Sequence, residues 1–111
     1  MHDCIFCKII NAELPSTKIA ENDDILVIKD IHPKAPIHYL IIPKKHMQDI
    51  QAMGTSDFFY GSKLLAMAQQ LSKTVAGAED FKLHVNSGKG AGQIVMHVHV
   101  HFIAGRLTGD L

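Results

Sequence analysis

Residues 92–103 read Gly-Gln-Ile-Val-Met-His-Val-His-Val-His-Phe-Ile, and they guide the interpretation of the whole chain. The three histidines, His97, His99 and His101, alternate with apolar residues, and a period of two predicts a half-buried β-strand. Because successive side chains of a strand point to opposite faces, all three imidazoles should share one face, with the outer two roughly 13 Å apart. We therefore expect the apolar residues to face a core and the imidazoles to line a cleft.

Two other interpretations apply to histidines in such a position. A single histidine on a strand is usually a surface residue or a satisfied core residue, and His2 and His84 are interpreted in this way. His-x-His spacing on a strand also suits chelation, so metal binding is an alternative to catalysis. The glycine-rich segment before the strand favours catalysis.

Length and charge narrow the class of protein. The 111 residues predict a single domain, 1–111, and eleven basic and eleven acidic residues give zero formal net charge. No basic run suggests a nucleic-acid partner, and the longest apolar runs, 25–28 and 39–42, are too short to cross a membrane. The first residues lack the pattern of a secretory signal, so we expect a cytoplasmic protein with reduced thiols.

The N-terminal segment carries both cysteines, as Cys4-Ile-Phe-Cys7. Isoleucines at helical spacing predict a short helix over 4–11, which Pro15 closes. Cys-x-x-Cys can be a redox pair, half of a zinc site or two buried thiols. The redox pair normally needs a βαβ context that is missing here, and the residues alone leave the other two open.

The rest of the hydrophobic pattern predicts an α+β fold. The expected elements are strands at 17–20, 25–30, 37–43, 81–86 and 97–103, a turn or short helix up to about 52, and a long helix from 55 to 77. Thr55 and Ser56 are candidate N-caps of the long helix. Its apolar stripe is formed by residues 58, 64, 65, 68, 71 and 75. These elements predict an antiparallel β-sheet of about five strands, with one long and one or two short helices on one face.

Residues 87–92, Ser-Gly-Lys-Gly-Ala-Gly, lead into the histidine strand. Three glycines let backbone N–H groups approach an anion closely, although the segment lacks the Gly-Lys-Ser/Thr of a Walker loop. Next to three imidazoles, this loop predicts phosphate held by amides beside a histidine nucleophile. Attack by a neutral imidazole would give a phospho-histidine intermediate that water then hydrolyses.

The histidine segment resembles the His-φ-His-φ-His-φ-φ motif of the histidine triad (HIT) superfamily of nucleotide hydrolases and transferases. Further motifs resemble its Hint-like branch, in order and at similar spacing, so that the resemblance covers roughly residues 4–106. These motifs are Cys4-Ile-Phe-Cys-Lys-Ile-Ile, Asp30-Ile31 with Ala35-Pro36, His38 with Ile41-Ile-Pro-Lys-Lys-His46, Asn86-Ser-Gly, and Gly92-Gln93.

The resemblance implies a homodimeric α+β protein that hydrolyses purine nucleoside 5′-phosphoramidates or acyl-adenylates. His99 corresponds to the nucleophile, which forms a nucleotidyl-histidine intermediate. His97 and His101 correspond to supporting residues around the phosphate, and His38 to the family's fourth histidine.

The substrate contacts follow from the same resemblance. Asp30 corresponds to the carboxylate that holds the ribose hydroxyls, and Ile31 to an apolar contact with the base. Asn86, Gly92 and Gln93 correspond to residues near the ribose and the phosphate.

A structural zinc is also implied, because family members that keep the Cys-x-x-Cys often hold one. The corresponding ligands are Cys4, Cys7, His46 and His97, a set that would close a tetrahedral site. Many Hint proteins lack the cysteines, so zinc is not expected to be required for catalysis.

This chain departs from the family pattern in two places. The branch usually carries serine or threonine after Gly-Gln, whereas Ile94 has no hydroxyl, so the contact is weaker or is replaced by Lys89 or water. The five residues after Arg106 contain no aromatic residue, although in relatives this tail reaches toward the partner's site.

Two alternatives to a phosphoramidase remain: a dinucleoside polyphosphate hydrolase like Fhit, and a non-catalytic module that binds purine nucleotide or scaffolds other proteins. The Ala35-Pro36 loop and the Cys-x-x-Cys segment favour the Hint branch over the first.

Overall fold

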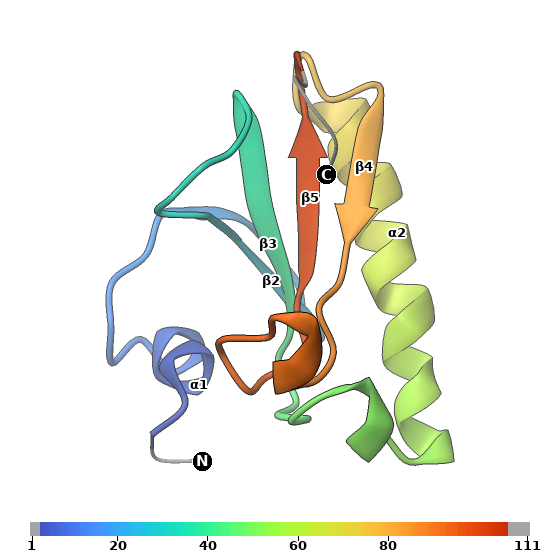
Figure 1. Cartoon of the computed structure of the whole chain (residues 1–111). Helices are drawn as coiled ribbons and strands as arrows, with labels where there is room; N and C mark the ends of the chain where they lie inside the picture. Colours follow the sequence, from blue (N-terminus) through green and yellow to red (C-terminus); the bar gives the residue numbers. More distant parts are fainter. Residues whose placement is uncertain (1–2, 107–111) are drawn as a thin grey trace.

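The computed structural model describes residues 3–106, so His2 and the tail after Arg106 lie outside the described residues. The chain forms one five-stranded antiparallel sheet with the strand order β1-β2-β3-β5-β4 (Figure 1). The strands are β1 (Lys18–Glu21), β2 (Ile25–Lys29), β3 (Ile37–Pro43), β4 (Phe81–His84) and β5 (Val100–Ala104). The helices are α1 (Ile5–Ile10), α2 (Phe59–Thr74) and the 3-10 turns η1 (Ile50–Ala52), η2 (Thr55–Phe58) and η3 (Lys89–Ala91). The predicted α+β class and the number of strands are confirmed.

The strand β3 occupies the predicted central place and has the predicted bounds. Its residues are buried on both faces because β2 and β5 flank it and helices cover both sides of the sheet. The edge strands β1 and β4 are short, as is common for strands with one unpaired side. In this register His101 of β5 lies between Leu40 of β3 and His84 of β4.

The main core lies between the sheet and α2. Side chains of alternate strand residues pack against Met67, Ala68 and Leu71 of the helix, as the period of two requires. The predicted helical stripe is wrong for Phe58 and Leu65, which are 60% and 63% exposed. The helix therefore buries a narrower face than its sequence suggests.

The start of the long helix also differs from the prediction. Thr55 and Ser56 lie inside the turn η2, which begins after Gly54. The capping carboxylate is that of Asp57, which accepts the N–H of Gly54 at 3.0 Å and pairs with Lys45.

The short helix α1 covers the face of the sheet opposite α2, so the prediction of helices on one face is wrong (Figure 1). Its Phe6 is buried against Leu26, Ile28, Leu40 and Ile42 of β2 and β3. This second cluster is smaller, and the space beside it forms the candidate site.

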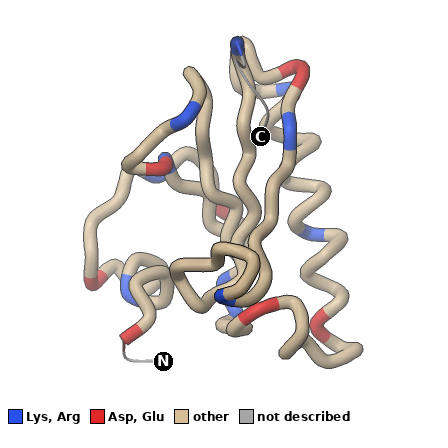
Figure 2. Tube along the Cα trace, in the orientation of Figure 1, with Lys and Arg blue, Asp and Glu red and all other residues tan. Residues whose placement is uncertain are grey.

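The charged residues are distributed over loops, helix and strand ends without one basic surface, in agreement with the balanced composition (Figure 2). None of the helices in residues 3–106 is long and apolar enough to span a membrane.

Candidate active site

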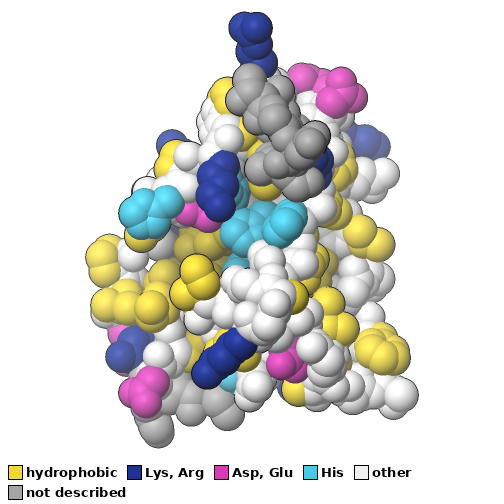
Figure 3. Space-filling model, in the orientation of Figure 1, with side chains coloured by type: hydrophobic (Ala, Val, Ile, Leu, Met, Phe, Trp, Pro, Cys, Tyr) yellow, Lys and Arg dark blue, Asp and Glu magenta, His cyan; other side chains and the backbone are white. Residues whose placement is uncertain are grey.

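A cleft of about 620 Å³ opens on the α1 side of the sheet. Histidine side chains gather there beside hydrophobic ones on the face shown in Figure 3. Its walls come from α1, the end of β2 with the following loop, β3, β4, the glycine-rich loop and β5. The predicted residues that line it are Asp30, Ile31, His38, Asn86, Gly92, Gln93, His99 and His101.

His97 does not line this cleft, so the prediction that all three imidazoles do so is wrong. The regular strand begins only at Val100, and His97 lies before it with its side chain fully buried beneath α1. Phe6 of α1 separates the two environments, with its ring 5.9 Å from that of His97 and 5.0 Å from that of His99.

The backbone fixes the tautomer of His99. Its Nδ1 lies 2.7 Å from the carbonyl oxygen of His97, and because a carbonyl only accepts, Nδ1 must carry the proton. The lone pair is therefore on Nε2. Burial lowers the pKa of His99 below its ordinary value, which keeps this imidazole neutral at pH 7. Such an imidazole is suited to act as a nucleophile.

A chain of hydrogen bonds fixes the next two histidines. The backbone N–H of Lys34 donates to Nδ1 of His38 at 3.0 Å, so Nε2 of His38 carries the proton and donates to Nδ1 of His101 at 2.9 Å. The proton of His101 is then on Nε2, which makes this nitrogen a donor. Burial, with the neighbouring His99 and His38, lowers the pKa of His101 to about 4.

Asp30, His38 and His101 bring one oxygen and two nitrogen atoms close together, as the ligands of a metal ion would be. Oδ2 of Asp30 lies 3.3 Å from Nε2 of His38 and 3.8 Å from Nδ1 of His101. Because the amide of Lys34 already occupies the lone pair of His38, Nε2 has none for a cation. The geometry therefore favours a proton chain over a metal.

The glycine-rich loop uses most of its backbone N–H groups for hydrogen bonds within the loop, whereas the predicted anion-binding nest requires them to be free. The N–H groups of Gly88, Ala91, Gly92 and Gln93 all donate to oxygens within residues 88–93. Gly88 and Gly92 have φ of 98° and 92°, which favours glycine at both positions. Lys89, the predicted replacement for the hydroxyl missing at Ile94, is exposed and does not line the cleft.

Sequence reasoning missed several cleft residues. His84, interpreted as a satisfied strand histidine, lines the cleft with its ring 5.7 Å from that of His101. Its position opposite His101 follows from strand pairing, which no single segment displays. Ile5, Phe6 and Ile9 of α1 also line the cleft, because α1 packs on the unexpected face.

The four predicted zinc ligands come together at α1, which supplies Cys7 and is capped by Cys4. Four ligand atoms lie within 4.8 Å of one another: Sγ of Cys4, Sγ of Cys7, Nδ1 of His46 and Nδ1 of His97. The N–N separation is 3.1 Å, and three S–N separations are 3.3, 3.4 and 3.6 Å. Tetrahedral zinc with bonds of ~2.0–2.3 Å would place these atoms roughly 3.3–3.5 Å apart. The cluster is compatible with such an ion.

The orientation of His97 agrees with a role as a ligand. Its Nε2 donates to the carbonyl oxygen of Pro43 at 2.8 Å, which leaves the lone pair on Nδ1, facing the thiols. Metal-bound histidines usually donate their other nitrogen in this way. His97 and His99 are thus held in opposite tautomers by two backbone carbonyls.

Comparison with known proteins agrees with this architecture. The HIT domain model matches residues 11–108. An uncharacterized HIT-like protein from Synechocystis is 38% identical over 94% of this chain and 91% of its own length.

Solved structures give the same result. A histidine triad protein from Clostridium difficile has a TM-score of 0.94 and 35% identity, over 100% of this chain and 97% of that one. A HIT family hydrolase from Legionella pneumophila has a TM-score of 0.88 and 38% identity, over 94% of both chains. A zinc-bound histidine triad protein from Mycobacterium smegmatis has a TM-score of 0.74 and 28% identity, over 95% and 76%.

The extent of these matches, together with the alternating histidines and the five-stranded sheet, shows that the chain belongs to the HIT domain family, whose solved members include hydrolases.

Proposed function

We propose that this protein hydrolyses nucleoside 5′-phosphoramidates or acyl-adenylates of purine nucleosides at the α phosphate, through a nucleotidyl-histidine intermediate on His99. The observation that carries the proposal is the unprotonated Nε2 of His99, oriented by the carbonyl of His97 inside the cleft. A neutral, oriented imidazole needs no separate base before it attacks phosphorus.

The cleft offers separate places for the parts of a nucleotide. The base lies against the apolar wall that Ile5, Ile9 and Ile31 form, and the carboxylate of Asp30 accepts hydrogen bonds from the ribose hydroxyls. The phosphate lies against His99 and His101. The Nε2–H of His101, fixed by the chain from Lys34 and His38, donates a hydrogen bond to a phosphoryl oxygen as negative charge develops.

Two steps complete the reaction. Nε2 of His99 forms a bond to phosphorus and the leaving group departs with its electron pair. Water then attacks phosphorus as the bond to Nε2 of His99 breaks and its electron pair returns to that nitrogen. The proton that water loses balances the one that the leaving group takes up, and the products are the nucleoside monophosphate and the neutral imidazole. Ile94, whose side chain is 91% exposed at the cleft, offers the leaving group an apolar contact and no hydrogen bond.

The Cys4, Cys7, His46 and His97 cluster is the proposed site of a structural zinc. The ligand separations and the orientation of His97 support it, as does the zinc bound to the M. smegmatis relative. Zinc there would join α1 to the segment before β5. It would supply no chemistry in the cleft, because its ligand His97 does not line the cleft.

A homodimer is part of the same proposal. Phe58, Phe59 and Leu65 near the start of α2 are 60%, 49% and 63% exposed, and β4 is an edge strand. Exposed apolar residues clustered on a soluble protein commonly mark an interface. Sedimentation showing only monomer at micromolar concentration would contradict it.

The test is hydrolysis of a fluorogenic adenosine phosphoramidate by the wild type and by His99→Ala, with AMP affinity as the control for folding. We expect turnover in the wild type, none above background in the variant, and AMP binding in both. Faster turnover of diadenosine triphosphate would instead support a Fhit-like hydrolase. AMP binding without turnover of either substrate would support the non-catalytic module.

A further inference from the structure

His84 is an imidazole of the cleft that the proposed function does not use. It ends the edge strand β4, and its register partner is His101 on β5. The two rings lie edge to face with centroids 5.7 Å apart, and both side chains line the cleft. His84 therefore faces the space in which the substrate reacts.

One nitrogen of His84 is held in place by its neighbours. The amide Nδ2 of Asn86 donates to the carbonyl oxygen of Ala91 at 2.6 Å, so its Oδ1 faces the other way. Nε2 of His84 donates to that oxygen at 3.0 Å. Within residues 3–106, Nδ1 of His84 has no hydrogen-bond partner. An imidazole with one nitrogen anchored and the other free is arranged as an oriented acid or base.

The strand order places His84 on the leaving-group side. Asp30, the proposed ribose contact, follows β2, whereas His84 ends β4, and both β3 and β5 lie between these strands. A nucleoside at Asp30 with its phosphate at His99 leaves the β4 side of the cleft, where His84 lies, for the remaining substituent of phosphorus.

We propose that His84 donates a proton to the leaving group and later accepts one from water. This inference rests on the proposed hydrolysis through His99. In the first step, Nε2 of His99 bonds to phosphorus as the P–N bond of the substrate breaks. The electron pair of that bond goes to the leaving nitrogen, which takes the proton from Nδ1 of protonated His84. The amine departs, and His84 stays neutral with Nε2–H on Asn86.

The second step restores both residues. Water attacks phosphorus and passes a proton to Nδ1 of His84, while the bond between phosphorus and Nε2 of His99 breaks and its electron pair returns to that nitrogen. The cycle consumes one water and needs no other reactant.

This role predicts a dependence on the leaving group. An alkylamine is too basic to leave without a proton, whereas 4-nitrophenolate leaves without one. His84 therefore directs the enzyme toward substrates with basic leaving groups, such as phosphoramidates of aliphatic amines.

The experiment compares an adenosine 5′-phosphoramidate of an alkylamine with the 4-nitrophenyl ester of AMP. In His84→Gln, the side-chain amide can still donate to Asn86 but cannot exchange a proton, and His84→Val removes both properties. We expect both variants to lose about a hundredfold in kcat/KM on the phosphoramidate and less than about threefold on the ester. Val85→Ala, at the exposed neighbouring position, is the matched control.

The other possible results would overturn either the role of His84 or the proposed hydrolysis itself. Equal losses on both substrates, or His84→Gln that behaves like the wild type, would show that His84 only positions Asn86. If His84→Val does not fold, as judged by thermal unfolding and AMP binding, His84→Gln decides alone. A wild type that turns over neither substrate overturns the proposed function, and with it this role. Turnover that depends on His99 but not on His84 overturns only the role of His84.

Discussion

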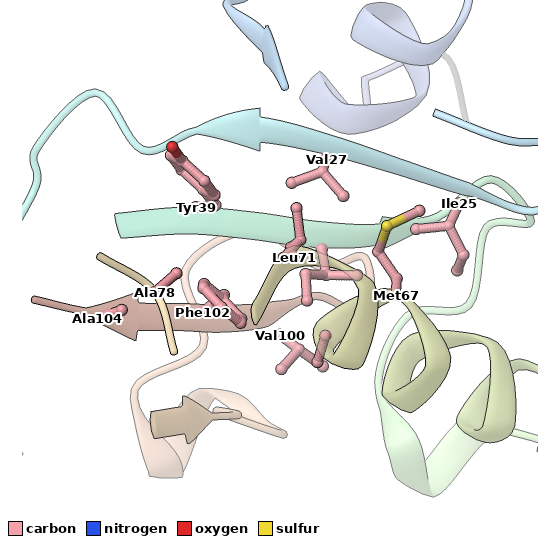
Figure 4. Packing of buried hydrophobic residues seen from close by; sticks show 11 residues of the cluster. Ile25, Val27, Tyr39, Met67, Leu71, Ala78, Val100, Phe102 and Ala104 are labelled. Atoms are coloured by element: carbon pink, nitrogen blue, oxygen red, sulfur yellow. The ribbon is translucent and has the colours of Figure 1, made fainter. Parts of the chain in front are cut away.

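The two faces of the sheet come from the same strands but carry different chemistry. Ile25 and Val27 of β2 and Tyr39 and Ile41 of β3 pack against α2, together with Val100 and Phe102 of β5, and form a core of hydrocarbon and aromatic side chains (Figure 4). On the α1 side, a smaller apolar cluster around Phe6 lies beside two thiols and the buried His38, His97 and His99. One face can therefore be optimised for packing, and the other must accommodate polar groups.

Buried polar groups are tolerated on the α1 side because each has a partner. Within residues 3–106, every fully buried side-chain nitrogen or oxygen makes a hydrogen bond. Backbone carbonyls and amides supply many of these partners, at His97, Pro43 and Lys34. We therefore expect the α2 face to provide most of the stability and the α1 face the chemistry, and the following variants test this division.

The largest expected effect is loss of activity on the α1 face. His99→Ala should reduce kcat at least about 10³-fold, because the nucleophile is removed. Its thermal unfolding midpoint should stay close to that of the wild type. Steady-state kinetics and calorimetry measure the two quantities, and a variant that keeps a tenth of the wild-type rate would exclude His99 as the nucleophile.

A core variant should show the opposite pattern. Phe102 is fully buried, with its ring stacked on those of Phe81 and Tyr39. Phe102→Ala should lower the free energy of unfolding by about 3–5 kcal/mol, because a large cavity replaces the ring. Denaturant titration measures it, and activity per folded molecule should be unchanged. Phe81→Ala, at a 38% exposed position, should cost less; equal losses would contradict the burial argument.

Zinc should stabilise the α1 face. With free zinc at 100 times its dissociation constant, binding contributes about 3 kcal/mol, which a chelator should remove. The measurement is thermal unfolding with and without chelator, beside elemental analysis of the purified protein. Cys7→Ser should be insensitive to chelator. Wild-type protein that contains no zinc and whose unfolding is unaffected by added zinc would rule out the site.

The smallest effect concerns pH. The pKa of His101 is about 4 in the folded protein and 6.5 ordinarily, so below pH 6.5 the unfolded chain binds a proton that the folded chain does not. Stability is therefore complete above pH 6.5 and is lost as the pH falls toward 4. After allowance for solvent screening, the loss is about 1–2 kcal/mol. Denaturant titrations of the wild type and His101→Gln between pH 7 and 4.5 test it: parallel curves would contradict it.

Local patterns predicted much of this molecule because they act within a few residues. The strand 37–43 follows from its apolar run and from Pro43 at its end, and the short helix after Cys4 follows from isoleucines at helical spacing. The pattern was less successful for the stripe of α2. Helical spacing shows only which apolar residues share one side of the helix. Their burial depends on whether the sheet covers that side, and at Phe58 and Leu65 it does not.

The alternation of histidines with apolar residues is enough to place the imidazoles on the side of the strand away from the α2 core, and the motifs are enough to indicate the family. The neighbours of each histidine depend on contacts between segments that are far apart in the chain. Helix α1 packs across the sheet from about ninety residues away, so that His97 is enclosed with two thiols and His99 faces the cleft. Strand pairing likewise brings His84 beside His101. Periodicity determines the side of a strand on which a residue lies, but contacts between remote segments determine its neighbours, and these decide its tautomer, its charge and its use.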